Sequence, residues 1–109
     1  MGGWSGGGGG SPGGGAAIAV GTFAGNGADD RAITTGLSSP PKLVQVVAVE
    51  ANLSAYKYSN FPAKEHATFA GGYQALANGI AISGNNFTVD DTTVGLNGVG
   101  TNYYWVAIG

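Results

Sequence analysis

The single histidine, His66, is the first residue to consider as a catalytic or metal-binding group. A zinc site needs three or four nitrogen, sulfur or carboxylate ligands, and the chain has no cysteine to complete one. A serine hydrolase of the common α/β type would need a Gly-x-Ser-x-Gly turn between a strand and a helix, and none is present. We therefore expect no catalytic or metal-binding role, and we interpret His66 as an exposed loop residue.

Two acidic pairs, Asp29-Asp30 and Asp90-Asp91, are the other candidates for chemistry. Calcium needs several converging oxygen ligands, and the spacing of an EF-hand loop is missing. Glycoside hydrolysis needs two carboxylates on opposite sides of a sugar cleft, which adjacent aspartates do not provide. We interpret both pairs as turn-forming residues that cap backbone amides, with a bound cation as the open alternative. No cofactor and no enzymatic activity are expected.

Tyrosines are the remaining candidates for a binding surface. Tyr56 and Tyr58 are two residues apart, so on a strand both side chains lie on one face. Tyrosine combines apolar area with a polar edge, and it suits protein interfaces and sugar rings alike. With Tyr73, these residues are expected to contact either another subunit or a host-surface receptor or glycan.

The elements that must position these residues are short strands separated by turn signals. The pattern predicts strands over residues 16–23, 31–35, 42–50, 55–59, 80–83, 87–90 and 102–108. The strand over 42–50 is expected to be central and buried on both faces. Residues 60–77 are expected to be irregular, with one helical turn near 63–69. The predicted fold class is all-β, a small antiparallel β-sandwich or jelly-roll-like domain spanning residues 16–109.

One turn between the first two predicted strands carries several residues with specific backbone roles. Asn26 and Gly27 tolerate positive φ and favour a tight turn. Asp30, or its neighbour Asp29, is expected to cap backbone amides and to pair with Arg31 or Asn26. Such a hydrogen-bonded corner would fix the register of the strands that it joins.

Residues 1–15 form a glycine-rich segment, MGGWSGGGGGSPGGG, which we predict to be an extended anchoring arm. Ordering a residue costs about 1–2 kcal/mol, and glycine loses the most freedom of all residues. The arm has only Trp4 and Pro12 as sizeable side chains to offset that cost. We expect a neighbouring protein to hold it, with Trp4 as the anchor. The alternative is that the arm folds against its own domain.

Charge is scarce in this sequence. Only 9% of the residues are charged and the net charge is −2, against about 25% charged residues in an average domain. The basic residues are scattered, which argues against nucleic-acid binding, and no apolar run has the length of a membrane helix. A small unit with so few charges is expected to bury part of its surface against other protein chains, including copies of itself.

The stretch from Gly21 to Val47, GTFAGNGADDRAITTGLSSPPKLVQVV, resembles a segment that recurs in bacteriophage virion proteins, G-T-Y-x-G-N-G-x-D-x-R-x-I-x-x-G-F-x-P-x-x-V-x-V. The stretches NFTV, NG and YYWVAI between residues 86 and 108 match the same family's second half. The chain departs from the family pattern at Ser38 to Pro41.

Members of this family are small β-sandwich domains of tail fibres, tail tips or capsid surfaces. The resemblance implies a non-enzymatic virion protein, assembled in the bacterial cytoplasm and commonly trimeric. Its expected partner is the major capsid protein, if it is a decoration or head-fibre protein. The alternative is a tail-tip or tail-fibre adhesin, with tail proteins as partners and a host-surface glycan as ligand.

Overall fold

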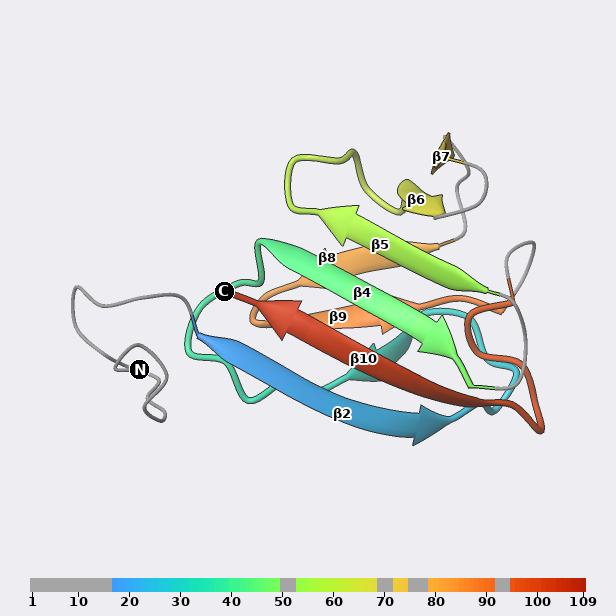
Figure 1. Ribbon diagram of the computed structural model, residues 1–109. Coiled ribbons are helices and arrows are strands. Elements are labelled where there is room, and N and C mark those ends of the chain that lie inside the picture. The colour runs from blue at the N-terminus through green and yellow to red at the C-terminus, as the bar shows by residue number, and fades with distance from the viewer. Residues whose placement is uncertain (1–16, 50–52, 69–71, 75–78, 92–94) are drawn as a thin grey trace.

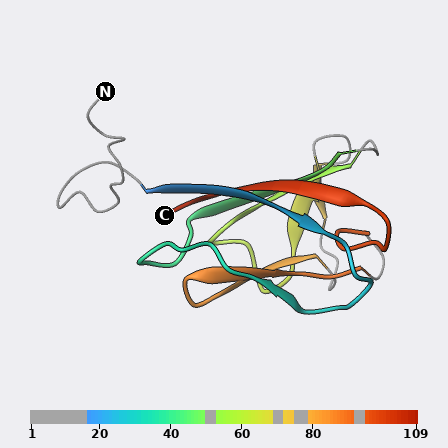
Figure 2. The same ribbon diagram turned by 90° about the horizontal axis from the view of Figure 1, so that it is seen from below.

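The computed structural model describes residues 17–49, 53–68, 72–74, 79–91 and 95–109, and within these ranges it consists of two antiparallel sheets packed face to face (Figures 1 and 2). The larger sheet has the spatial order β2 (Ile18–Ala24), β10 (Asn102–Ile108), β4 (Leu43–Ala48), β5 (Ser54–Tyr58), β6 (His66–Thr68) and β7 (Gly72–Gln74). The smaller sheet has the order β3 (Arg31–Ile33), β9 (Asn86–Val89) and β8 (Ile80–Ser83).

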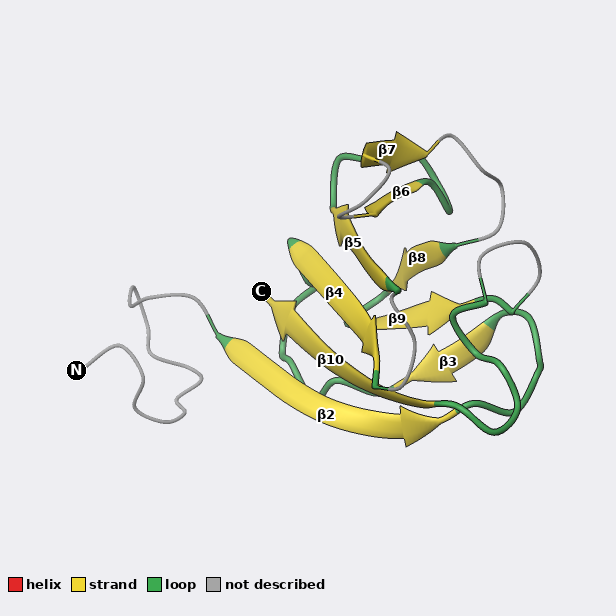
Figure 3. Ribbon diagram, turned by 45° about the vertical axis from the view of Figure 1, so that its right-hand side comes forward, coloured by secondary structure: helices red, strands yellow, loops and turns green. Residues whose placement is uncertain are grey.

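The expected all-β sandwich is confirmed, as Figure 3 shows by its yellow strands. Among the described residues, no helix is long and apolar enough to cross a membrane. The predicted arm, with Trp4 and Pro12, lies outside the described residues.

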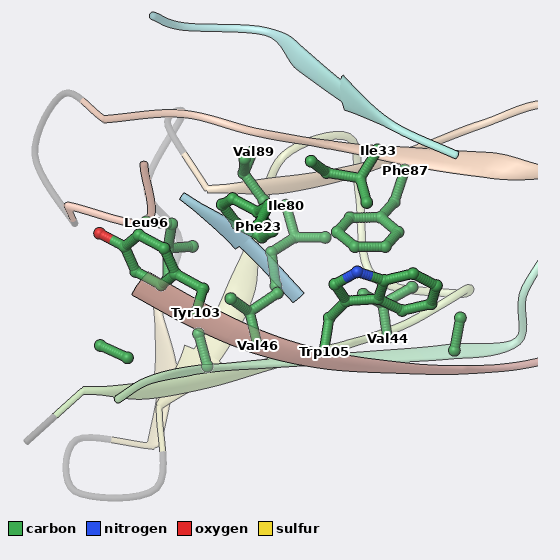
Figure 4. Packing of buried hydrophobic residues seen from close by; sticks show 13 residues of the cluster. Phe23, Ile33, Val44, Val46, Ile80, Phe87, Val89, Leu96, Tyr103 and Trp105 are labelled. Carbon is green, nitrogen blue, oxygen red and sulfur yellow. The ribbon is translucent and has the colours of Figure 1, made fainter. Parts of the chain in front are cut away.

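The core lies between the two sheets and is organised around one tryptophan (Figure 4). Trp105 on β10 lies directly opposite Gly21 on β2. A Cβ atom at Gly21 would be 2.7 Å from the indole ring, so only glycine leaves room for it. From the smaller sheet, Phe87 meets the indole edge to face, with ring centroids 5.5 Å apart. The two sheets are therefore joined by an aromatic contact in a geometry that such rings favour.

Strand β4 alternates between buried and half-buried residues. Val44, Val46 and Ala48 are buried against the smaller sheet, whereas Leu43 and Val47 remain half-buried. The expectation that this strand is buried on both faces is therefore wrong. The reason is that the smaller sheet covers only one face of the larger one (Figure 2).

The helical turn expected near residues 63–69 is also wrong. The amide of Glu65 donates to the Pro62 carbonyl and closes one turn. The chain then continues as strand β6, which pairs with β5 and β7. Pairing with the edge of β5 supplies partners for the backbone, and this tertiary contact overrides the local helical preference.

Replacing the buried phenylalanine tests the inter-sheet contact. Phe87→Ala removes a fully buried ring, and we expect the free energy of unfolding to fall by about 3–5 kcal/mol. That is a large share of the roughly 5–15 kcal/mol typical of a domain. Val99→Ala, at a residue that is 77% exposed, is the control and should leave stability unchanged. Denaturant unfolding measures both, and a loss below about 1 kcal/mol in Phe87→Ala would contradict this account.

Candidate functional site

The outer face of the larger sheet is the surface on which the exposed apolar residues gather. In Figure 1 this face is turned toward the viewer, with β2, β10, β4 and β5 in front of β8 and β9. The strand registers place its side chains in rows that run across these four strands. One row is Ile18, Ile108, Leu43 and Tyr58, the next is Val20, Val106, Gln45 and Tyr56, and the third is Thr22, Tyr104, Val47 and Ser54.

None of the side chains in these rows is charged, and several are large and exposed. Val20 is 73% exposed, Tyr104 57% and Ile18 41%. The described charged residues lie before, between or inside the strands: Lys42 before β4, Lys57 inside the sandwich, and Asp29, Asp30, Arg31, Lys64, Glu65, Asp90 and Asp91 in or beside the loops. We call the three rows the outer face. Its chemistry suits contact with another apolar or uncharged surface.

The two tyrosines singled out from the sequence lie on the outer face. The rings of Tyr56 and Tyr58 meet edge to face with centroids 5.9 Å apart, and Tyr58 meets Phe61 in the same way at 5.6 Å. Tyr73 lies in β7 opposite Ala67, which is itself opposite Tyr56. The side chain of Tyr73 is outside the described part of the structure.

Between the two tyrosines, Lys57 points into the sandwich. It is only 2% exposed, and its ammonium group donates to the carbonyls of Phe61, Pro62 and Glu65 at 3.2, 3.2 and 2.8 Å. Burial lowers the pKa of Lys57, and the nearby charge of Glu65 opposes this by a smaller amount. The outward tyrosines agree with the expected contact surface, whereas a buried lysine between them is unusual for a charged residue. Lys57 is a loop anchor that fixes where β6 begins.

A groove opens at one end of the outer face. Its volume is about 390 Å³. Its lining residues come from β2, β10 and the residue that follows β4: Thr22, Phe23, Ala24, Val49, Asn102, Tyr103 and Tyr104. Tyr104 lies opposite Thr22 in the register and two residues from Asn102 on β10, so the three side chains share one face. A flat aromatic ring with neighbouring neutral hydrogen-bonding groups can hold a small uncharged polar ligand.

The predicted turn residues meet at a buried asparagine, Asn97, that sequence reasoning did not single out. Its amide nitrogen donates to the Asn26 side chain and to the Ala28 carbonyl, at 2.6 and 2.8 Å. Its side-chain oxygen accepts from the Asn26 amide and from Arg31, at 3.2 and 3.0 Å. Gly27 adopts positive φ in this turn. Arg31 thus contacts Asn97, and it also donates to the Ala24 carbonyl.

The two acidic pairs face each other across the loops. Asp90 is buried and accepts from the amides of Asp30 and Gly79, at 2.7 and 3.2 Å. Lys64 bridges Asp30 and Asp90, and hydrogen bonds to Asp30 and then Asp90 raise its pKa. Asp29 accepts from the amide of Asp91 at 3.0 Å. Among the described residues no group of three or more potential metal ligands occurs. One aspartate of each pair therefore caps backbone amides, and the ammonium group of Lys64 supplies the positive charge between the pairs.

His66 is fully buried, so its interpretation as an exposed loop residue is wrong. The cause is the pairing of β6 between β5 and β7, which turns the ring inward against Gly79. Neither ring nitrogen makes a hydrogen bond. Burial lowers the pKa of His66, and the charge of Lys57 lowers it further. The nearby Lys64 carbonyl raises the pKa of His66 in part, although it is not placed to accept a hydrogen bond from the ring. The ring is a buried neutral group, which suits packing.

Comparison with known proteins assigns no relative to this chain: no family model, no curated protein and no solved structure matches it. The resemblance to virion domains therefore remains a prediction from the residues quoted above.

The buried imidazole makes stability depend on pH. Near pH 7.5 His66 is neutral in both states, but below about 6.5 the unfolded chain gains a proton that the folded chain does not take up. The free energy of unfolding should therefore fall as pH drops from about 7 to 5. His66→Leu should remove this contribution and keep or raise stability at pH 7, because no hydrogen bond is lost. Denaturant midpoints across this range measure it, and parallel profiles for the two proteins would refute it.

Proposed function

We propose that this protein is a non-enzymatic structural module that is mounted on a larger protein assembly through its outer face and its glycine-rich arm. The observation that carries the proposal is the uncharged outer face, with Val20 and Tyr104 more than half exposed. Four strands about 4.8 Å apart and seven residues at about 3.3 Å each outline a face of roughly 440 Å². Exposed apolar side chains gathered on one such face often mark an interaction site.

We further propose that the assembly is a bacteriophage particle and that the protein docks on the capsid as a decoration or head-fibre protein. The support is the resemblance of residues 21–47 and 86–108 to virion domains, together with the low charge of the whole chain. A docked module needs fewer charged residues to stay dispersed than a free monomer does. The proposed partners are the major capsid protein and further copies of this chain.

Particle composition tests this role. In purified phage particles the chain should be present in many copies, in fixed proportion to the shell protein, as measured by quantitative mass spectrometry. Val106→Glu places a charge at the centre of the outer face, and occupancy should fall at least about tenfold because burying an unpaired charge costs several kcal/mol. Val99→Glu is the matched control in an exposed loop and should keep full occupancy. Equal occupancy of the two variants would contradict the docking role of this face.

The arm is tested separately. Trp4→Ala should release the protein from particles while its thermal unfolding midpoint stays the same, because the hydrophobic core is built from residues 19–107. The measurement is particle occupancy beside a melting curve of the purified variant. Retention at the wild-type level would remove Trp4 as the anchor.

A second candidate function is a tail-tip or tail-fibre adhesin that binds a host-surface glycan. The observation that favours it is the aromatic group Tyr56, Tyr58 and Phe61 on and beside the outer face, together with the groove next to Tyr104. Aromatic rings with nearby hydroxyl and amide groups are suited to the apolar and polar sides of a neutral sugar.

Glycan binding separates this function from docking on the capsid. If the protein is an adhesin, a glycan array should show a neutral oligosaccharide ligand, and Tyr58→Ala should weaken binding several-fold because the exposed ring is lost. Val99→Ala should bind as the wild type does. The absence of any saturable glycan ligand, with many copies per particle, would exclude the adhesin.

A further inference from the structure

Strand β2 is the longest edge strand of the sandwich. Within the described residues the sheets end at β2 and β7 in the larger sheet and at β3 and β8 in the smaller one. Strands β7 and β3 have three residues each and β8 has four, whereas β2 has seven. Short edges offer little backbone for pairing, so β2 is the edge that can accept another strand.

The backbone groups that face outward from β2 can be assigned from its hydrogen bonds to β10. The amide of Gly25 donates to the Thr101 carbonyl, and that of Gly109 donates to the Ala17 carbonyl. Odd-numbered residues of β2 therefore point their backbone groups at β10. The even-numbered residues Ile18, Val20 and Thr22 point theirs away from the sheet.

This edge lacks the usual protection against pairing. Its sequence, IAVGTFA, has no charged residue and no proline. At its far end the Ala24 carbonyl already accepts from Arg31, which marks where pairing must stop. Figure 1 shows β2 at the lower margin of the front layer, with no other described strand of that layer beyond it. With respect to the residues that the structure describes, three outward amides and three outward carbonyls remain, from Ile18, Val20 and Thr22.

We propose that β2 pairs antiparallel with β2 of a second copy of this chain. Val20 lies opposite Val20 of the second copy on a two-fold axis perpendicular to the sheet, and Ile18 lies opposite Thr22. All three pairs are then of the hydrogen-bonded kind, and each exchanges two N–H···O bonds. No like charges meet across the axis, because β2 carries none.

The chemistry of β2 favours a second copy as the occupant, because its outward residues pair with one another about Val20 without any like-charge contact. A two-fold axis perpendicular to the sheet keeps both outer faces on the same side, so the joined sheet doubles the uncharged surface of one copy. The inference thus deepens the proposed mounting role, on which it rests, by naming the unit that docks. Its test uses purified protein alone, so its failure leaves the particle experiments unaffected.

Single cysteines test the pairing and its register, since the chain has no cysteine of its own. Opposite residues in a hydrogen-bonded pair have Cα atoms about 5.5 Å apart, within the range of a disulfide. Val20→Cys should therefore form a covalent dimer under mild oxidation. Val99→Cys is matched in residue type and exposure and should remain monomeric on the same gel. Thr22→Cys should also remain uncrosslinked, because the two copies of residue 22 would lie about 14 Å apart.

Two further substitutions separate edge pairing from face-to-face association. Val20→Pro removes an outward amide that β2 does not use within its own sheet, so the fold should survive. By light scattering the wild type should have twice the chain mass of 10.7 kDa, and Val20→Pro should have the mass of a single chain. Val106→Lys, on the outer face but off the edge, should remain dimeric.

A monomeric or trimeric wild type would overturn the pairing, as would Val20→Cys crosslinking no faster than Val99→Cys or slower than Thr22→Cys. The same holds if Val106→Lys becomes monomeric while Val20→Pro remains a dimer. Loss of particle occupancy in Val20→Pro with a monomeric wild type would show that a different chain occupies the edge, which also rejects the second copy.

Discussion

The uneven division of strands between the two sheets is the constraint on which the rest of the structure depends. In the described part of the chain, a sheet of six strands is covered by a sheet of three, and only on its inner face. Trp105 joins the two layers, and Gly21 opposite it supplies the space that the ring needs. The exposure of the outer face follows from this one-sided covering of the larger sheet. The outer face has no layer above it within the described residues, and its side chains are uncharged, so the sandwich has one side suited to a partner.

Several charged side chains in the described part of the protein hold loops. Asp90 accepts two backbone amides, and Lys64 connects it to Asp30 at the neighbouring turn. Asn97 does the same work without charge for the turn that contains Asn26. These contacts join segments that are far apart in the sequence, and they fix the ends of β3 and β9 relative to each other. Because these charged groups lie at the loops, they add no charge to the outer face.

The strand pattern and the sandwich were predictable because alternation and turn residues are local signals. NYYWVAI alternates outward and inward side chains, and Asn26-Gly27 lies in a turn with Gly27 at positive φ, as the sequence indicates. The positions of Lys57 and His66 were not predictable, because both depend on β6 pairing beside β5. Local composition favours an exposed lysine and an exposed histidine, and only the tertiary pairing buries them. Asn97 was overlooked for the same reason, since its partners are about 70 residues away. A hydrogen-bonded network around one buried side-chain amide leaves no residue spacing in the sequence that would reveal it.

The inward ammonium group of Lys57 has a consequence for how local motion of this protein can be observed. Its three carbonyl partners lie at or within one residue of the turn between Pro62 and Glu65, so the amine becomes accessible only when that segment detaches from the sandwich. Burial is the main cause of its lowered pKa, so the freed amine, once solvated, returns toward the pKa of an ordinary surface lysine and differs from Lys42 mainly in access. The rate at which an acylating reagent modifies Lys57, relative to exposed Lys42, therefore measures how often the β5–β6 connection opens.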